Sequence, residues 1–172
     1  MFLKNYFFET TFQKWNVEGE ISLVGGEPMM YPHLAELLYH LNESPAITRV
    51  AILTNGTFIP QDVFKAILDT RPTVQISIDG INEQSHDFIR GKGNYSKSIS
   101  HIKKLVSHNI PVFIHYVISK YTIPIPKSFI DYLNDLGVKQ ITFSRDVPIG
   151  SSDTSFLLSN KFYKTSKTIE YF

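Results

Sequence analysis

Short apolar runs alternate with amphipathic stretches along most of the chain. The apolar runs predict buried strands, and the stretches with apolar residues three and four positions apart predict helices. Strands that alternate with helices in this way favour an α/β fold with a parallel sheet. The pattern predicts five strands, near residues 20–24, 49–53, 73–78, 112–118 and 139–144.

Helices are expected between these strands, and their ends carry the usual signals. Pro60 opens one helix, and Gly137 stops another. Further helices are expected around residues 2–15 and after Ser159, which resembles an N-cap. Because the period is regular and no linker interrupts it, we expect one domain over residues 1–172, with a sheet curved as a partial barrel.

Polar residues and glycines gather where the predicted strands end. In parallel α/β folds these carboxyl ends form the ligand-binding edge, because loops and helix N-termini converge there. Pro28 restricts Glu27 to an extended conformation, and a carboxylate held in this way suits an ammonium group. The strand ends read Gly25-Gly26-Glu27-Pro28, Thr54-Asn55-Gly56-Thr57, Ser77-Ile78-Asp79-Gly80, Ser119-Lys120 and Ser144-Arg145.

The third strand alternates between two kinds of side chain. Gln75, Ser77 and Asp79 share one face, and the apolar residues between them share the other, which we expect to pack against helices. A hydroxyl and a carboxylate placed together on one face suit the hydroxyl groups of a ribose.

Several of these motifs also have a simpler, purely structural interpretation. Gly25-Gly26, Asn55-Gly56 and Asp79-Gly80 are each common turn dipeptides. The glycines after Arg90 lack the spacing of a phosphate-binding P-loop, and neither a hydrolase nucleophile elbow nor a dinucleotide fingerprint is present. The six histidines show no metal-ligand spacing, so surface or interfacial positions are predicted for them.

Composition narrows the functional classes. The chain has 17 Lys and Arg against 16 Asp and Glu, a net charge of +1, so neither nucleic acid nor a membrane surface is an expected partner. No apolar stretch of about 20 residues is present to span a bilayer, and a cytoplasmic location is expected. The chain has no cysteine, which excludes disulfides, thiolate metal sites and a thiol nucleophile within these residues.

Taken in order, the strand ends resemble the radical SAM superfamily, especially its molybdenum-cofactor cyclases and its peptide-modifying enzymes with SPASM extensions. The match is carried by Leu23-Val24-Gly25-Gly26-Glu27-Pro28, by Ile52-Leu53-Thr54-Asn55-Gly56-Thr57, by Val74-Gln75-Ile76-Ser77-Ile78-Asp79-Gly80 with His86, Ile89, Arg90 and Gly91, and by Phe143-Ser144-Arg145 with Pro148 and Gly150. The resemblance implies a partial (βα)6 TIM-like barrel of parallel strands. The first strand of that barrel is expected to be missing, with the domain incomplete at its N-terminus.

The resemblance also implies a cofactor and its contacts. S-adenosylmethionine would be cleaved reductively on a [4Fe–4S] cluster to give a 5′-deoxyadenosyl radical. The positioning residues it implies are Gly25, Gly26, Glu27, Pro28, Thr54, Asn55, Ser77, Asp79, Arg90, Ser119 and Arg145. No catalytic acid or base and no metal ligand is assigned to this chain.

One departure from the family is large. The family's Cys-x-x-x-Cys-x-x-Cys loop, which ligates the cluster, has no counterpart here, so the chain alone is expected to be inactive. Two alternatives remain: a non-catalytic descendant that binds an adenosyl group or another protein, and an unrelated α/β enzyme in which Asp79, Lys120 and Arg145 handle a phosphorylated substrate. The substrate, a peptide or a small molecule, is not specified, and an unpaired first strand is expected to favour self-association.

Overall fold

The computed structural model describes residues 14, 15 and 17–145, with the backbone alone at Arg145. The expected helix after Ser159 lies outside these residues, as does most of the one expected around 2–15. The elements are β1 (Gly19–Leu23), the 3-10 helix η1 (Pro28–Met30), α2 (Leu34–Glu43), β2 (Ile47–Thr54), α3 (Gln61–Thr70), β3 (Thr73–Ser77), α4 (Glu83–Arg90), α5 (Asn94–Ser107), β4 (Val112–Ile118), α6 (Lys127–Asp135) and β5 (Gln140–Arg145).

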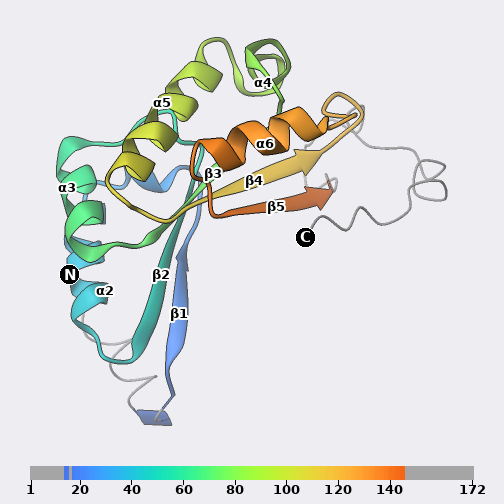
Figure 1. The fold of residues 1–172 in the computed structure, drawn as a ribbon. Coiled ribbons are helices and arrows are strands. Elements are labelled where there is room, and N and C mark those ends of the chain that lie inside the picture. The colour runs from blue at the N-terminus through green and yellow to red at the C-terminus, as the bar shows by residue number, and fades with distance from the viewer. Residues whose placement is uncertain (1–13, 16, 146–172) are drawn as a thin grey trace.

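The five strands form one parallel sheet in the order β1-β2-β3-β4-β5. Figure 1 shows that the sheet is strongly twisted, with β1 and β2 crossing the direction of β4 and β5. Each strand begins and ends within two residues of the predicted position. The predicted α/β fold with five parallel strands is confirmed.

The helices gather along one side of this curved sheet (Figure 1). The side chains beneath them, among them Ile52, Ile76 and Ile114, are fully buried. Their neighbours along each strand are only half-buried, as expected from the alternation of side chains in a strand. We call the opposite side of the sheet the inner face. It carries Arg49, Ala51, Leu53, Gln75, Ser77, Phe113, His115, Val117, Thr142 and Ser144.

Helix α4 has no counterpart in the sequence pattern, which predicts no helix over residues 83–90 and so puts Arg90 on a connecting segment. In the structure Arg90 is the last residue of this helix. The helix begins at a capping box in which Asn82 and Ser85 bond to each other's backbone. It is joined to α5 by Asp87, whose carboxylate accepts hydrogen bonds from the backbone nitrogens of Gly93 and Tyr95.

Among the described residues, no helix combines the length and the apolar character that a membrane crossing requires.

Candidate functional site

Glu27 lies just after β1, and its carboxylate joins the ends of β1 and β2. Its backbone is extended, with φ −142° and ψ 107°, as Pro28 requires. Oε1 accepts hydrogen bonds from Met29 N at 3.1 Å and from Thr54 Oγ1 at 2.6 Å, and Oε2 accepts one from Asn55 N at 2.9 Å. The side chain is therefore held in one orientation, although it remains half-buried.

The loop after β2 is fixed by its own polar groups. The Asn55 side chain accepts hydrogen bonds from the nitrogen and the hydroxyl of Thr57, at 2.8 and 2.7 Å. Gly56 has φ +70°, and a Cβ there would lie 2.7 Å from the Ile76 side chain, so only glycine fits. The turn interpretation of Asn55-Gly56 holds, and the turn presents Asn55 N to Glu27.

A second polar cluster lies at the ends of β3 and β4. Asp79 is 3% exposed, and its carboxylate accepts hydrogen bonds from Arg90 Nε and, at 3.3 Å, from Val117 N. The Asp79 backbone nitrogen donates to His86 Nδ1 at 3.1 Å. Asp79 thus connects α4 to two strands and holds Arg90, whose side chain is 35% exposed.

His86 is the buried support of this cluster. Its ring is 1% exposed, and burial lowers the pKa of His86, which favours the neutral form. Because Nδ1 accepts a hydrogen bond, the neutral ring carries its proton on Nε2. The prediction of a surface or interfacial position is wrong for His86, because the ring satisfies a backbone donor that would otherwise be buried without a partner.

Ser119 and Arg145 stand apart from these clusters. Ser119 is buried, and its hydroxyl accepts a hydrogen bond from Tyr121 N at 3.2 Å and lies 3.4 Å from Thr122 Oγ1, so it shapes its own loop. Arg145 ends β5 opposite Ile118 in register, and only its backbone is described.

Two cavities open at this edge of the sheet. One has a volume of about 600 Å³. It is lined by Glu27 and Asn55 and by residues of the segments 29–32 and 57–63. It contains neither Ser77 nor Asp79, so a single pocket shared by Glu27, Ser77, Asp79 and Arg90 stays a prediction.

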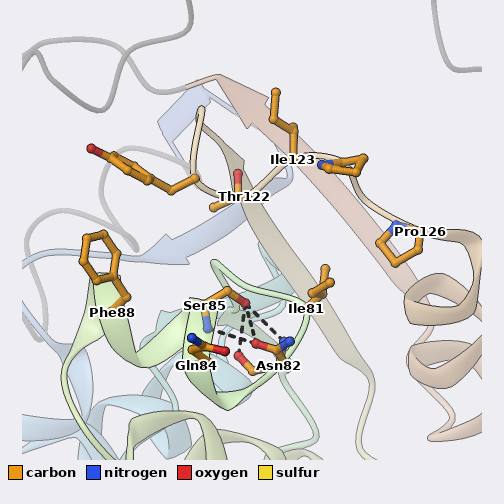
Figure 2. Close-up of a pocket in the computed structure, with 10 residues that line it drawn as sticks. Ile81, Asn82, Gln84, Ser85, Phe88, Thr122, Ile123 and Pro126 are labelled. Carbon is orange, nitrogen blue, oxygen red and sulfur yellow. Dashed lines mark hydrogen bonds between the residues drawn. The ribbon is translucent and has the colours of Figure 1, made fainter.

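The other cavity, of about 520 Å³, lies between α4 and the loop after β4. Figure 2 shows Ser85, Asn82 and Gln84 on one wall and Thr122, Ile123 and Pro126 on the other. No cluster of three or more potential metal-ligating side chains occurs in the part of the chain that the structure describes.

A polar pair on the inner face was missed by the sequence analysis. His115 Nε2 lies 2.8 Å from Ser144 Oγ, and Ser77 is the register partner of His115 on β3. The period-two alternation along β4 was the signal that places His115 on this face.

The model of the radical SAM superfamily matches residues 9–133. The chain belongs to the radical SAM superfamily. The AdoMet-dependent heme synthase of Methanosarcina barkeri is 31% identical over 145 residues, which are 83% of this chain and 41% of that protein. The subtilosin biosynthesis protein AlbA of Bacillus subtilis is 27% identical over 125 residues, 71% of this chain and 28% of AlbA. This radical SAM chain therefore spans less than half the length of these curated relatives.

Solved structures share its fold. Native anSMEcpe with bound AdoMet superposes with a TM-score of 0.69 at 20% identity, covering 91% of this chain and 46% of that one. Streptococcus suis SuiB bound to S-adenosylmethionine gives a TM-score of 0.68 at 17% identity, covering 77% of this chain and 31% of SuiB. The curved five-stranded sheet thus matches part of a radical SAM barrel.

Radical SAM proteins use S-adenosylmethionine and a [4Fe–4S] cluster, and the residues of this chain fit these two groups differently. The Glu27 carboxylate accepts three hydrogen bonds from the protein, and a carboxylate has about four acceptor positions, so it can accept one more from an ammonium group. A [4Fe–4S] cluster does not fit, because the sequence contains no cysteine to ligate it.

Proposed function

We propose that this radical SAM chain binds S-adenosylmethionine at the carboxyl ends of its strands, as the core of an enzyme whose cluster ligands lie outside these residues. The observation that carries the proposal is the half-buried Glu27 carboxylate, held by three donors beside Gly25 and Gly26. Both glycines are exposed, and neither has an atom within 4 Å of the place a Cβ would occupy. A ligand's amino group can therefore approach backbone and carboxylate together.

Each remaining candidate has a role that its contacts support. Asp79 has both oxygens engaged, so we assign it the holding of Arg90, whose guanidinium retains donors for the ligand's carboxylate. Ser77 ends β3 on the inner face and suits a ribose hydroxyl. Thr54 and Asn55 hold Glu27, Pro28 fixes its backbone, and Ser119 and Arg145 are proposed to border the ligand from β4 and β5.

These residues position a ligand and exclude water, and none is assigned as an acid or a base. When bound to a cluster, S-adenosylmethionine supplies the radical chemistry of the superfamily. Because this chain provides no thiolate, we expect it to be inactive alone.

The missing cysteines also favour a second candidate, a non-catalytic member of the superfamily that retains an adenosyl site. Membership of the superfamily removes the third hypothesis, an unrelated phosphate-handling enzyme. For a catalytic protein the substrate would be a peptide or a small molecule. A peptide is supported by SuiB, whose structure includes its precursor peptide SuiA, and by anSMEcpe, which was solved with peptides.

Calorimetric titration with S-adenosylhomocysteine, a stable analogue, tests the proposed site. We expect saturable binding to the wild-type chain and about tenfold weaker binding to Glu27→Gln, because the charged partner of the amino group is lost. The matched control is Glu36→Gln, whose carboxylate is exposed on α2 and faces His33. Absence of binding to the wild-type chain, or equal binding to Glu27→Gln, would contradict the proposal.

A further inference from the structure

The inner face of the sheet carries a histidine that is not among the proposed cofactor contacts. His115 lies in the middle of β4, and its Nε2 is 2.8 Å from the Ser144 hydroxyl of β5. Ser144 is two residues beyond Thr142, the register partner of His115, so the two side chains share a face. Within the described part of the chain, the Nδ1 atom of His115 has no hydrogen-bond partner.

The register places this ring beside the proposed ribose site. Ser77 is the partner of His115 on β3, and neighbouring strands lie about 4.8 Å apart. The proposed cofactor contacts lie mainly on the β1–β3 side, at Glu27, Ser77 and Asp79. His115 and Ser144 lie on the β4–β5 side, within the strands. A ligand held by the first set, and bordered by Ser119 and Arg145 at the ends of β4 and β5, leaves the inner face within these two strands open to another molecule.

The surroundings of His115 indicate what that molecule carries. Phe113, two residues earlier on β4, presents a ring on the same face, and the Arg49 guanidinium lies 5.5 Å from the centre of that ring. Arg49 is 43% exposed, with Glu20 3.6 Å away as its ion-pair partner. Along this face an imidazole, an aromatic ring and an accessible cation lie one after another. This set of groups suits a substrate with carbonyl or carboxylate oxygens.

We propose that His115 binds the second reactant, donating a hydrogen bond from Nδ1 to a carbonyl or carboxylate oxygen next to the cofactor's ribose. Ser144 is the positioning residue. We assign the Ser144 hydroxyl as the donor to Nε2, 2.8 Å away. The neutral ring then carries its proton on Nδ1, from which it can be donated to the ligand. This inference rests on the proposed function, because the cofactor fixes where the second reactant lies.

Ring-nitrogen NMR of the whole chain, labelled with ¹⁵N in its histidines, tests the proposal. The probes are sodium acetate for a carboxylate and N-methylacetamide for a peptide carbonyl, each titrated with and without S-adenosylhomocysteine. We expect one of them to shift the Nδ1 signal of His115 saturably. Ser144→Ala should weaken that binding about fivefold, since a ring without its partner loses its fixed tautomer.

Variants separate a ligand contact from a structural role. His115→Phe should abolish probe binding, whereas His115→Gln, which retains a donor, should keep it within about threefold. His108→Phe is the matched control, because His108 is exposed at the end of α5 and its contact with the Phe64 ring can be kept by another ring. A probe that shifts His108 as much as His115, or that shifts neither, would overturn the proposal.

The cofactor titration keeps the two proposals apart. We expect His115→Phe to bind S-adenosylhomocysteine within about twofold of the wild-type affinity. A tenfold loss would place His115 in the cofactor site and overturn the inference. If the wild-type chain does not bind S-adenosylhomocysteine, the proposed function fails, and the probe titration of the free chain still decides whether His115 binds a ligand.

Discussion

The Asp79 carboxylate is the more deeply buried of the two carboxylates of the candidate site. It receives Arg90 Nε and Val117 N while it is 3% exposed, so removing its charge leaves a buried amide facing two donors. We expect Asp79→Asn to lower the free energy of unfolding by about 1–3 kcal/mol.

Urea denaturation followed by circular dichroism measures this change. The control is Asp131→Asn, which breaks an exposed ion pair with Lys127 and should cost less than about 1 kcal/mol. Equal effects of the two substitutions would show that burial of Asp79 does not strengthen its contacts.

Gly80 has a steric requirement that does not depend on any ligand. A Cβ there would lie 2.2 Å from the backbone nitrogen of His86, so α4 would have to move. We expect Gly80→Ala to lower the melting temperature by several degrees, a loss on the order of 2 kcal/mol or more.

Scanning calorimetry measures the melting temperatures. Gly26→Ala is the matched control, because nothing lies within 4 Å of the place its Cβ would occupy. It should melt like the wild-type chain. A Gly80→Ala variant that is equally stable would mean that α4 can shift without cost.

Single residues show what the sequence could and could not predict. The extended backbone of Glu27 and the alternation along β3 follow from neighbouring residues, and both were predicted correctly. The contact of Asp79 N with His86 and the pairing of His115 with Ser144 join different elements. Such contacts depend on how elements pack, which local periodicity does not encode.

At the scale of elements, α4 was the helix that the sequence pattern missed. Its sequence has no apolar stripe, and His86 is its only buried residue. The helix is held instead by the capping box at Asn82 and by polar contacts to β3. Helices that pack through an apolar face were predicted, because the spacing of their apolar residues follows the buried face. In α3 these residues are Val63, Ala66 and Ile67.

The docking of α4 on β3 should depend on pH. Burial lowers the pKa of His86 in the folded chain, so the unfolded chain binds a proton first as the pH falls. Stability is therefore full well above the unfolded pKa of about 6.5 and decreases as the pH falls through and below that value.

Urea denaturation at several pH values on both sides of the unfolded pKa measures how steeply stability depends on pH. His86→Asn, whose side-chain oxygen can replace Nδ1 as acceptor, should flatten this dependence. His108→Asn is the control, because His108 is exposed. A slope that His86→Asn leaves unchanged would assign the dependence to other groups.

At the scale of the whole molecule, the absence of cysteine determines the expected metal chemistry. After anaerobic reconstitution with iron and sulfide, we expect the chain to carry no [4Fe–4S] cluster, because thiolates are the required ligands. Iron analysis and visible absorption of the desalted protein measure the outcome. Stoichiometric iron with a broad visible shoulder would refute this and indicate histidine or carboxylate ligation.

The remaining prediction concerns the outer edge of β1, the first strand of the sheet. Within the described residues β1 pairs only with β2, and none of its side chains is fully buried. An open edge of this kind favours pairing with another chain, so we expect concentration-dependent association in sedimentation velocity.

A lysine on the edge should suppress this association. Ser22→Lys places a charge on an exposed position of β1, and Ser96→Lys, on an exposed position of α5, is the control. A wild-type chain that stays monomeric at high concentration, or equal suppression by both variants, would count against edge pairing.

The order of the strands in the sheet is also their order along the chain. During synthesis on a ribosome, each new strand emerges when the strand it must join has already been made. Each pair joins strands that are consecutive along the chain, with only helical crossovers between them. The entropic cost of closure therefore stays small at every step. The sheet can therefore grow one unit at a time from β1 to β5, with each completed unit serving as the template for the next.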